Sequence, residues 1–266
     1  MKEIEDLENW FHKKGKTLVA LSGGVDSALV AFAAQRALGN QAIAVTADYK
    51  TLSKEELESA KRVCKEIGIR HLIIEYNELD NPNFVKNDQN RCFHCRTELA
   101  ENLLRLSKIE KIDTIVDGTN LDDLTEYRPG LLALKKNGIQ SPLVESGFSK
   151  SDVRDVAKKV GLSIHDKPSN SCLASRIPWG SRVTKEKLAR IEKCEMMLKQ
   201  LFGVRQVRVR DFGNSANIEV DKDEIVFLDD KKKMSILKKY MNGFGFDTIV
   251  IDPNGYRSGK LNVIMD

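Results

Sequence analysis

Long apolar runs are missing from this 266-residue sequence, and no stretch approaches the roughly 18 apolar residues that a membrane-spanning helix needs. Residues 1–16 alternate charges and contain no apolar segment, which disfavours a signal peptide. Low-complexity tracts and internal repeats are also missing, so the chain is expected to fold throughout. We therefore expect a cytoplasmic protein that has no membrane partner.

Neither sign of charge dominates, because 43 Lys and Arg residues stand against 39 Asp and Glu residues. The lysines are spread along expected helices, which favours a solvated surface over a nucleic-acid patch, and no nucleic-acid partner is expected. Cysteine is also scarce, at five residues. In a reducing compartment these are expected to be thiols or metal ligands rather than disulfides.

Short apolar segments alternate with amphipathic helical patterns over the first part of the chain. The pattern predicts strands at 16–22, 41–49, 70–76 and 113–118, and helices up to about 14 and at 26–38, 53–68, 92–109 and 149–161. Strands that alternate with crossover helices imply a parallel, doubly wound α/β sheet with both faces covered.

The pattern changes after residue 163. Segment 164–184 contains two prolines and no periodicity, which indicates a functional loop at a domain junction. Further along, the sequence predicts helices at 185–201 and from 221 to about 241, and strands within 204–213, 215–220 and 246–252. We expect a nucleotide-binding domain at 1–170 and a smaller α+β domain at 171–266.

Two adjacent glycines follow the first expected strand, in LVALSGGVDSALV. Glycine lets the backbone approach a ligand closely, and the N-terminus of the next helix favours a phosphate. The segment lacks the Gly-Lys-Ser/Thr of a Walker A loop and the G-x-G-x-x-G of a dinucleotide fold. It resembles the PP-loop of the ATP pyrophosphatases, which cleave ATP between its α and β phosphates. The resemblance implies ATP binding by Ser22, Gly23, Gly24, Val25, Asp26 and Ser27, with Asp26 and Ser27 catalytic and Asp26 helping to hold Mg²⁺.

Cys92 and Cys95 form a C-x-x-C at the start of an expected helix, whose dipole favours thiolates. Tetrahedral zinc would normally need two further ligands, and the candidates are Cys172, His94 and His165. Three thiolates suit an iron–sulfur cluster that keeps one iron open. Zinc and unligated thiols remain as alternatives.

With the glycine loop, RCFHCR, DGTNLDDLTEYRPG and KPSNSCLASRIPWG in this order, the sequence resembles the LarE family over most of its length. These sulfur transferases act in the biosynthesis of the nickel-pincer nucleotide cofactor. The resemblance implies adenylation of the carboxylates of pyridinium-3,5-biscarboxylic acid mononucleotide, their conversion to thiocarboxylates, and release of AMP and pyrophosphate. It also implies a sulfide donor and a homo-oligomer, because the small domain resembles the oligomerisation domain of GMP synthetase.

The family has two versions of the sulfur step. In one, a loop cysteine matched by Cys172 gives up its own sulfur. In the other, cysteines matched by Cys92, Cys95 and Cys172 hold a [4Fe-4S] cluster that carries a transferable sulfide. All three cysteines occur here, which favours the cluster version and leaves the sacrificial route as the alternative.

Four polar or small residues lie at or just after the carboxyl ends of expected strands and are candidates for nucleotide binding. Gly118, Thr119 and Asn120 come after the fourth strand, where a parallel sheet places its ligand sites. Asp48 ends the second strand and is expected near the adenosine, with a plain turn acid as the alternative.

Four arginines are candidates for anion binding. Arg128 and Arg176 are expected to hold phosphate or carboxylate groups, with surface salt bridges as the alternative. Arg208 and Arg210 share one face of a strand and are expected to bind the phosphate of the substrate nucleotide. The alternative is that this pair is neutralised by Glu219 or Asp221.

Three other functions remain open. A tRNA thiolase of the PP-loop class would use the same ATP chemistry and a three-cysteine cluster, although its usual RNA-binding domain is missing. An amide-forming synthetase would leave the three cysteines unexplained. A non-catalytic nucleotide-binding module would not need Asp26 and Ser27.

Overall fold

The computed structural model describes residues 2–125 and 129–257. The chain forms two compact units: Met1–Glu78 with Cys92–Asn170, and Leu79–Arg91 with Ser171–Asp266. The units part after Asn170, at the position of the expected domain boundary. Segment 79–91, which we expected in the first domain, groups with the second unit instead.

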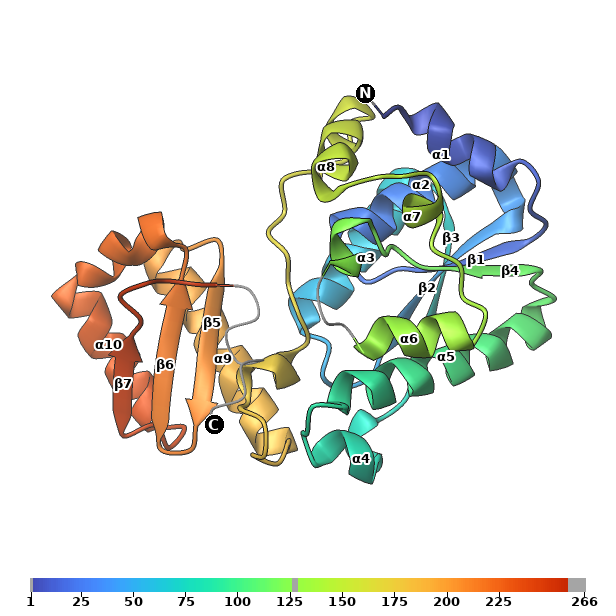
Figure 1. The fold of residues 1–266 in the computed structure, drawn as a ribbon. Coiled ribbons are helices and arrows are strands. Elements are labelled where there is room, and N and C mark those ends of the chain that lie inside the picture. Colours follow the sequence, from blue (N-terminus) through green and yellow to red (C-terminus); the bar gives the residue numbers. More distant parts are fainter. Residues whose placement is uncertain (1, 126–128, 258–266) are drawn as a thin grey trace. The chain divides into compact units, whose positions relative to one another are not determined.

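The first unit is built on a parallel sheet in the order β3-β2-β1-β4 (Figure 1). Thr17 of β1 pairs with Ala42 of β2 and with Thr114 of β4, so the carboxyl ends of these strands meet at one edge. A parallel bridge from Val116 to Gln140 extends the sheet beyond β4. The strands are β1 Thr17–Ala20, β2 Ala42–Asp48, β3 Arg70–Glu75 and β4 Thr114–Val116.

Helices cover both faces of this sheet. Alternate side chains of a strand point to opposite faces, so Val19 joins the core formed with α1, α2, α3, α7 and α8, whereas Leu18 joins the core formed with α5 and α6. Figure 1 shows α1 and α2 above the sheet and α5 and α6 below it. The helices are α1 Ile4–Phe11, α2 Val25–Leu38, α3 Lys54–Ile67, α5 Arg91–Glu110, α6 Pro129–Lys136, α7 Pro142–Glu145 and α8 Lys150–Lys159.

Side-chain caps fix two of the predicted helix starts. Ser53 accepts a hydrogen bond from the N–H of Glu56 at the start of α3, and Ser149 accepts one from Asp152 at the start of α8. Such caps satisfy N–H groups that have no partner within the helix. The parallel doubly wound α/β class predicted from the sequence is therefore the one observed, although helices α6 and α7 were not predicted.

The second unit contains the short helix α4 Pro82–Val85, helix α9 Lys185–Phe202, helix α10 Lys231–Asn242 and a three-stranded sheet in the order β5-β6-β7. The strands are β5 Val207–Phe212, β6 Ser215–Val220 and β7 Thr248–Ile251; β5 is antiparallel to β6, and β7 is parallel to it. One prediction was wrong here, because the helix expected from 221 to about 241 is interrupted. A 3₁₀ segment, Lys222–Asp229, comes first, and Asp230 then caps α10 through the N–H groups of Lys232 and Lys233. No helix within the described ranges is long and apolar enough to cross a membrane.

Candidate nucleotide-binding site

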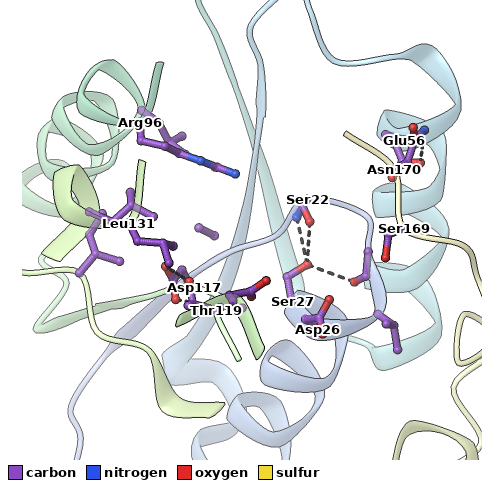
Figure 2. A pocket seen from close by; sticks show the side chains of 18 of the residues that line it. Ser22, Asp26, Ser27, Glu56, Arg96, Asp117, Thr119, Leu131, Ser169 and Asn170 are labelled. Carbon is purple, nitrogen blue, oxygen red and sulfur yellow. Dashed lines mark hydrogen bonds between the residues drawn. The ribbon is translucent and has the colours of Figure 1, made fainter. Parts of the chain in front are cut away.

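The glycine-rich loop lies between β1 and α2, at the carboxyl edge of the sheet. Ser27 Oγ accepts a hydrogen bond from the Ser22 N–H at 3.1 Å and donates one to the Gly24 carbonyl at 3.2 Å, which closes the loop on itself (Figure 2). Gly23 has φ +81°, and a Cβ there would lie 2.6 Å from the carbonyl oxygen of Glu56. The loop therefore requires glycine at position 23 for both conformation and space.

A cavity opens above this loop and has two chemically different flanks. Figure 2 shows Arg96 and Leu131 on one side of Ser22 and Ser27, and Glu56 and Asn170 on the other. The first flank is largely apolar and the second is polar. The apolar flank is lined by Leu99, Leu103, Leu131, Leu134 and Ile139, and the polar flank includes Glu56, Lys167, Ser169 and Asn170.

The turn after β4 forms the floor of the cavity. Buried Asp117 accepts hydrogen bonds from the Thr119 N–H at 3.1 Å, the Thr119 hydroxyl at 2.8 Å and the Ser141 hydroxyl at 2.8 Å. Burial raises the pKa of Asp117, and these hydrogen bonds oppose the rise. At Gly118 a Cβ would lie 2.6 Å from the backbone nitrogen of Ser27, so a glycine is needed for the turn to approach the glycine-rich loop.

The same turn reaches the expected magnesium ligand. Asn120 donates from Nδ2 to Asp26 Oδ1 at 3.1 Å, and its Oδ1 accepts hydrogen bonds from the N–H groups of Asp122 and Asp123. Gly118 and Thr119 line the cavity, as does Asp26. The structure thus brings the candidates from 118–120 next to the glycine-rich loop.

Two lysines that sequence analysis missed flank the glycine-rich loop. The Lys150 ammonium contacts the Asp26 carboxylate. The Lys167 ammonium donates to Glu56 Oε2 at 2.9 Å, to the Gly23 carbonyl at 2.8 Å and to Ser59 Oγ at 2.8 Å. Their spacing in the sequence carries no signal, because the fold brings them to the loop from distant segments.

Cys92 and Cys95 lie within the first five residues of α5, at the helix start as predicted. Residues three apart on a helix share a face, so both thiols can be directed to one ligand. Burial raises the pKa of the neighbouring Glu78 to about 7, while hydrogen bonds from Cys95 and Thr51 act in the opposite direction. Arg96, another residue that sequence analysis missed, directly follows this pair and lines the cavity. Over the described part of the chain, no three His, Cys, Asp or Glu side chains are arranged as a metal site.

Cys172 opens a 3₁₀ turn, Leu173–Arg176, in the second unit. Arg176 is 1% exposed and donates to the carbonyls of Ser171 and Cys172 at 2.7 and 3.1 Å, which holds the backbone around this cysteine. Its guanidinium also forms a two-point pair with Glu195 at 2.8 and 2.9 Å. The alternative for Arg176 was a salt bridge at the surface. The salt bridge is present, with Glu195, but it is buried and does not lie at the surface.

The two arginines of β5 differ in their partners. Arg210 donates to Glu219 Oε2 at 2.9 and 2.7 Å and to the Ser175 carbonyl at 2.9 Å, which matches the alternative in which a carboxylate neutralises it. Arg208 donates to the Val207 carbonyl at 2.8 Å and lies over the ring of Tyr256, with 5.0 Å between guanidinium carbon and ring centroid. Burial lowers the pKa of Arg208.

The last two candidates, Asp48 and Arg128, are not among the residues that line the cavity in the described part of the chain. Asp48 ends β2, pairs with Lys50 at 3.5 Å, and does not belong to the described lining of the cavity. Arg128 lies outside the described residues.

Comparison with known proteins adds the family. Residues 16–102 match the model of the queuosine biosynthesis protein QueC. The chain is 42% identical to an uncharacterized protein of Synechocystis sp., over 99% of this chain and 98% of that protein. It is 29% identical to the pyridinium-3,5-bisthiocarboxylic acid mononucleotide synthase of Lactiplantibacillus plantarum, over 93% of this chain and 89% of that protein. The chain belongs to the LarE family. Its first unit has the PP-loop ATP pyrophosphatase fold.

Relatives outside the LarE family share a smaller part of the chain. The tRNA-specific 2-thiouridylase MnmA of Wolbachia pipientis is 28% identical over 58% of this chain and 52% of that protein. For this LarE-family member, membership of the PP-loop class supports ATP as the nucleotide and ATP-dependent sulfur transfer as the general chemistry.

Proposed function

We propose that this LarE-family protein inserts sulfur into pyridinium-3,5-biscarboxylic acid mononucleotide, adenylating each carboxylate with ATP and converting it to a thiocarboxylate. The observation that carries the proposal is the glycine-rich loop with Asp26 and Ser27, which lines a cavity in a chain that resembles the Lactiplantibacillus synthase almost end to end. We expect the reaction in the cytoplasm, where ATP and reduced thiols are available.

The residues around the loop suit the adenylation half of this reaction. The α2 N-terminus and the loop backbone favour the pyrophosphate of ATP, and the apolar flank offers a surface for a flat base. A carboxylate oxygen of the substrate bonds to the α phosphorus while the bond to pyrophosphate breaks. Fixed positive groups near the loop stabilise the charge that develops on the leaving pyrophosphate.

Magnesium fits this site. Asp26 presents a carboxylate to the cavity, and its two oxygens have lone pairs beyond those used by Asn120 and Lys150. Mg²⁺ in such sites takes one or two carboxylates together with phosphate oxygens and water. We assign Asp26 as its protein ligand, where the ion would neutralise charge on the phosphates.

The sulfur half is assigned to Cys92, Cys95 and Cys172. The shared face of Cys92 and Cys95 in α5 suits two thiolate ligands of one [4Fe-4S] cluster. When bound, the cluster would supply the sulfide that displaces AMP, and an external donor would replace it. The alternative is that Cys172 gives up its own sulfur once.

The phosphate of the substrate nucleotide remains assigned to the arginines of β5. The guanidinium cation of Arg208 supports this proposal, and Arg210 adds a second cation, which is paired with Glu219. We also propose a homo-oligomer, with the second unit as the assembling part.

A second candidate is thiolation of a tRNA base, which the partial resemblance to MnmA favours. Pyrophosphate release from ATP separates the candidates. With the purified protein, Mg²⁺ and sulfide, we expect release that depends on the mononucleotide and is unaffected by tRNA. Release that depends on tRNA would favour the second candidate, and no release with either would indicate a non-catalytic module.

The source of sulfur is tested by anaerobic purification, iron and labile-sulfide counting, and intact mass after turnover. About four irons per chain, lost in Cys92→Ala, Cys95→Ala or Cys172→Ala, with no loss of protein mass, are expected for the cluster route. An iron-free protein that turns over once and loses the elements of hydrogen sulfide at Cys172 would establish the sacrificial route instead.

A further inference from the structure

A hydrogen bond from its backbone N–H fixes Lys150 at the edge of the cavity. Its N–H donates to Asp122 Oδ2 at 2.9 Å, in the turn after β4, while Ser149 caps the helix that Lys150 begins. The flexible side chain reaches the Asp26 carboxylate. Its exposed fraction is 27%, and that of the Asp26 side chain is 21%, so this ion pair remains open to solvent and to a ligand.

The other lysine of the cavity is bound differently. An ammonium group has three donors, and Lys167 uses all three, on Glu56, Gly23 and Ser59. Among described residues, the Lys150 ammonium donates to Asp26 and to no second side chain. Lys167 is therefore a fixed part of the loop, whereas Lys150 has donors available for another acceptor.

The partner of Lys150 is the residue assigned to magnesium. An ammonium and a divalent cation compete for the same carboxylate, because each is attracted by its negative charge. A polyphosphate bound in the loop brings several oxygens within reach of a lysine stem anchored at the cavity edge. Lys150 is thus placed to pair with the Asp26 carboxylate when no nucleotide is bound and with phosphate oxygens when a nucleotide is bound.

We propose that Lys150 is an exchangeable cation of the phosphate site. Without nucleotide its ammonium neutralises Asp26. When Mg²⁺ takes that carboxylate, the ammonium turns to the terminal phosphates and binds the group that leaves as pyrophosphate. This inference rests on the nucleotide half of the proposed function and needs neither the carboxylate substrate nor the sulfur step.

The test uses two probes that separate the two partners of Lys150 in the full-length protein. Calorimetry measures binding of inorganic pyrophosphate with Mg²⁺, and electron paramagnetic resonance measures binding of Mn²⁺ alone. In Lys150→Met, we expect binding of Mg²⁺-pyrophosphate to weaken about tenfold, because a charge-assisted hydrogen bond is lost. Binding of Mn²⁺ alone should tighten several-fold, because the competing ammonium is gone.

Two variants serve as controls. Lys150→Arg keeps the cation and should retain most of the pyrophosphate affinity. Lys158→Met removes an exposed lysine from the same helix and should change neither probe. A Lys150→Met protein that binds Mg²⁺-pyrophosphate as tightly as the wild type, or that loses affinity for both probes together, would overturn the proposal.

Different results would contradict the proposed function and the role of Lys150. A wild-type protein that binds Mg²⁺-pyrophosphate, with the opposite shifts in Lys150→Met, but makes no thiocarboxylate would overturn the sulfur chemistry and leave the role of Lys150 standing. A wild-type protein that does not bind Mg²⁺-pyrophosphate would overturn both.

Discussion

Cation–carboxylate pairs occur in both units, and they differ in burial and geometry. Lys150 and Asp26 meet at a cavity, with 27% and 21% of their side chains exposed. Arg176 and Glu195 are 1% and 11% exposed and meet through two hydrogen bonds. A buried pair cannot release one partner without leaving an uncompensated charge, whereas a partly exposed pair can exchange that partner for a ligand. A cation paired with a carboxylate therefore serves structure in the second unit and, in our proposal, ligand exchange in the first.

Breaking the buried pair should have the largest effect. Arg176→Met leaves the Glu195 carboxylate buried without its guanidinium, and we expect the free energy of unfolding to fall by about 3–5 kcal/mol. Urea denaturation measures this. Adding Glu195→Gln, which keeps an acceptor for the Val209 N–H, should regain part of the loss. A loss below about 1 kcal/mol in the single variant would contradict the structural role of the pair.

The contact between the β4 turn and the phosphate loop comes next. Gly118→Ala would place a methyl group 2.6 Å from the Ser27 nitrogen, and backbone cannot swing aside as a side chain does. We expect a loss of about 2–3 kcal/mol in unfolding free energy and weaker nucleotide binding. Gly24→Ala is the matched control for stability, because its nearest neighbour would be Ser22 Oγ at 3.5 Å. Equal stability of the two variants would show that the close approach is absent.

The two lysines of the cavity give a smaller and more selective effect. Lys167→Met removes three hydrogen bonds, one of them to the buried Glu56, and should lower the free energy of unfolding by about 1–2 kcal/mol. Lys150→Met should change it by less than about 0.5 kcal/mol. Thermal and urea unfolding of both variants provide the comparison. A larger loss in Lys150→Met would reverse the assignment of fixed and exchangeable cation.

The last effect concerns Asp117 and is a dependence of stability on pH. Its folded pKa is raised by burial, so the native state binds a proton more tightly than the unfolded state does. Stability is fully present below the unfolded pKa of about 3.9 and falls as pH rises from there through the folded pKa, by at most about 1.4 kcal/mol per pH unit. Asp117→Asn should flatten this part of the curve in urea titrations. An unchanged slope would show that Asp117 is not its source.

Much of the fold could be predicted from local signals. The helices predicted at 53–68 and 149–161 begin at serine caps in the structure, and the predicted alternation of strands and helices corresponds to the observed parallel sheet. The predicted helix from 221 to about 241 was wrong because periodicity continues through Asp230. That side chain accepts hydrogen bonds from the N–H groups of Lys232 and Lys233 and begins a new helix there.

The site could be predicted only where its residues form a motif. The glycine-rich loop and the turn at 118–120 were found because strand ends and glycines mark them. Lys150 and Asp26 are 124 positions apart, and Lys167 is 111 positions from Glu56, so only the folded sheet brings these charges together. The carboxylate partner of Arg176 also depends on packing in the second unit, whereas Glu219, the partner of Arg210, was named from the sequence as an alternative.

The central claim is that ATP activates a carboxylate of the substrate before sulfur enters. The most direct measurement follows ¹⁸O from the labelled carboxylates of the mononucleotide into AMP by mass spectrometry. The proposed route predicts one ¹⁸O in each AMP, because the carboxylate oxygen bonded to the α phosphorus leaves with it when sulfide attacks. AMP that forms together with thiocarboxylate but carries no ¹⁸O would contradict adenylation of the carboxylate.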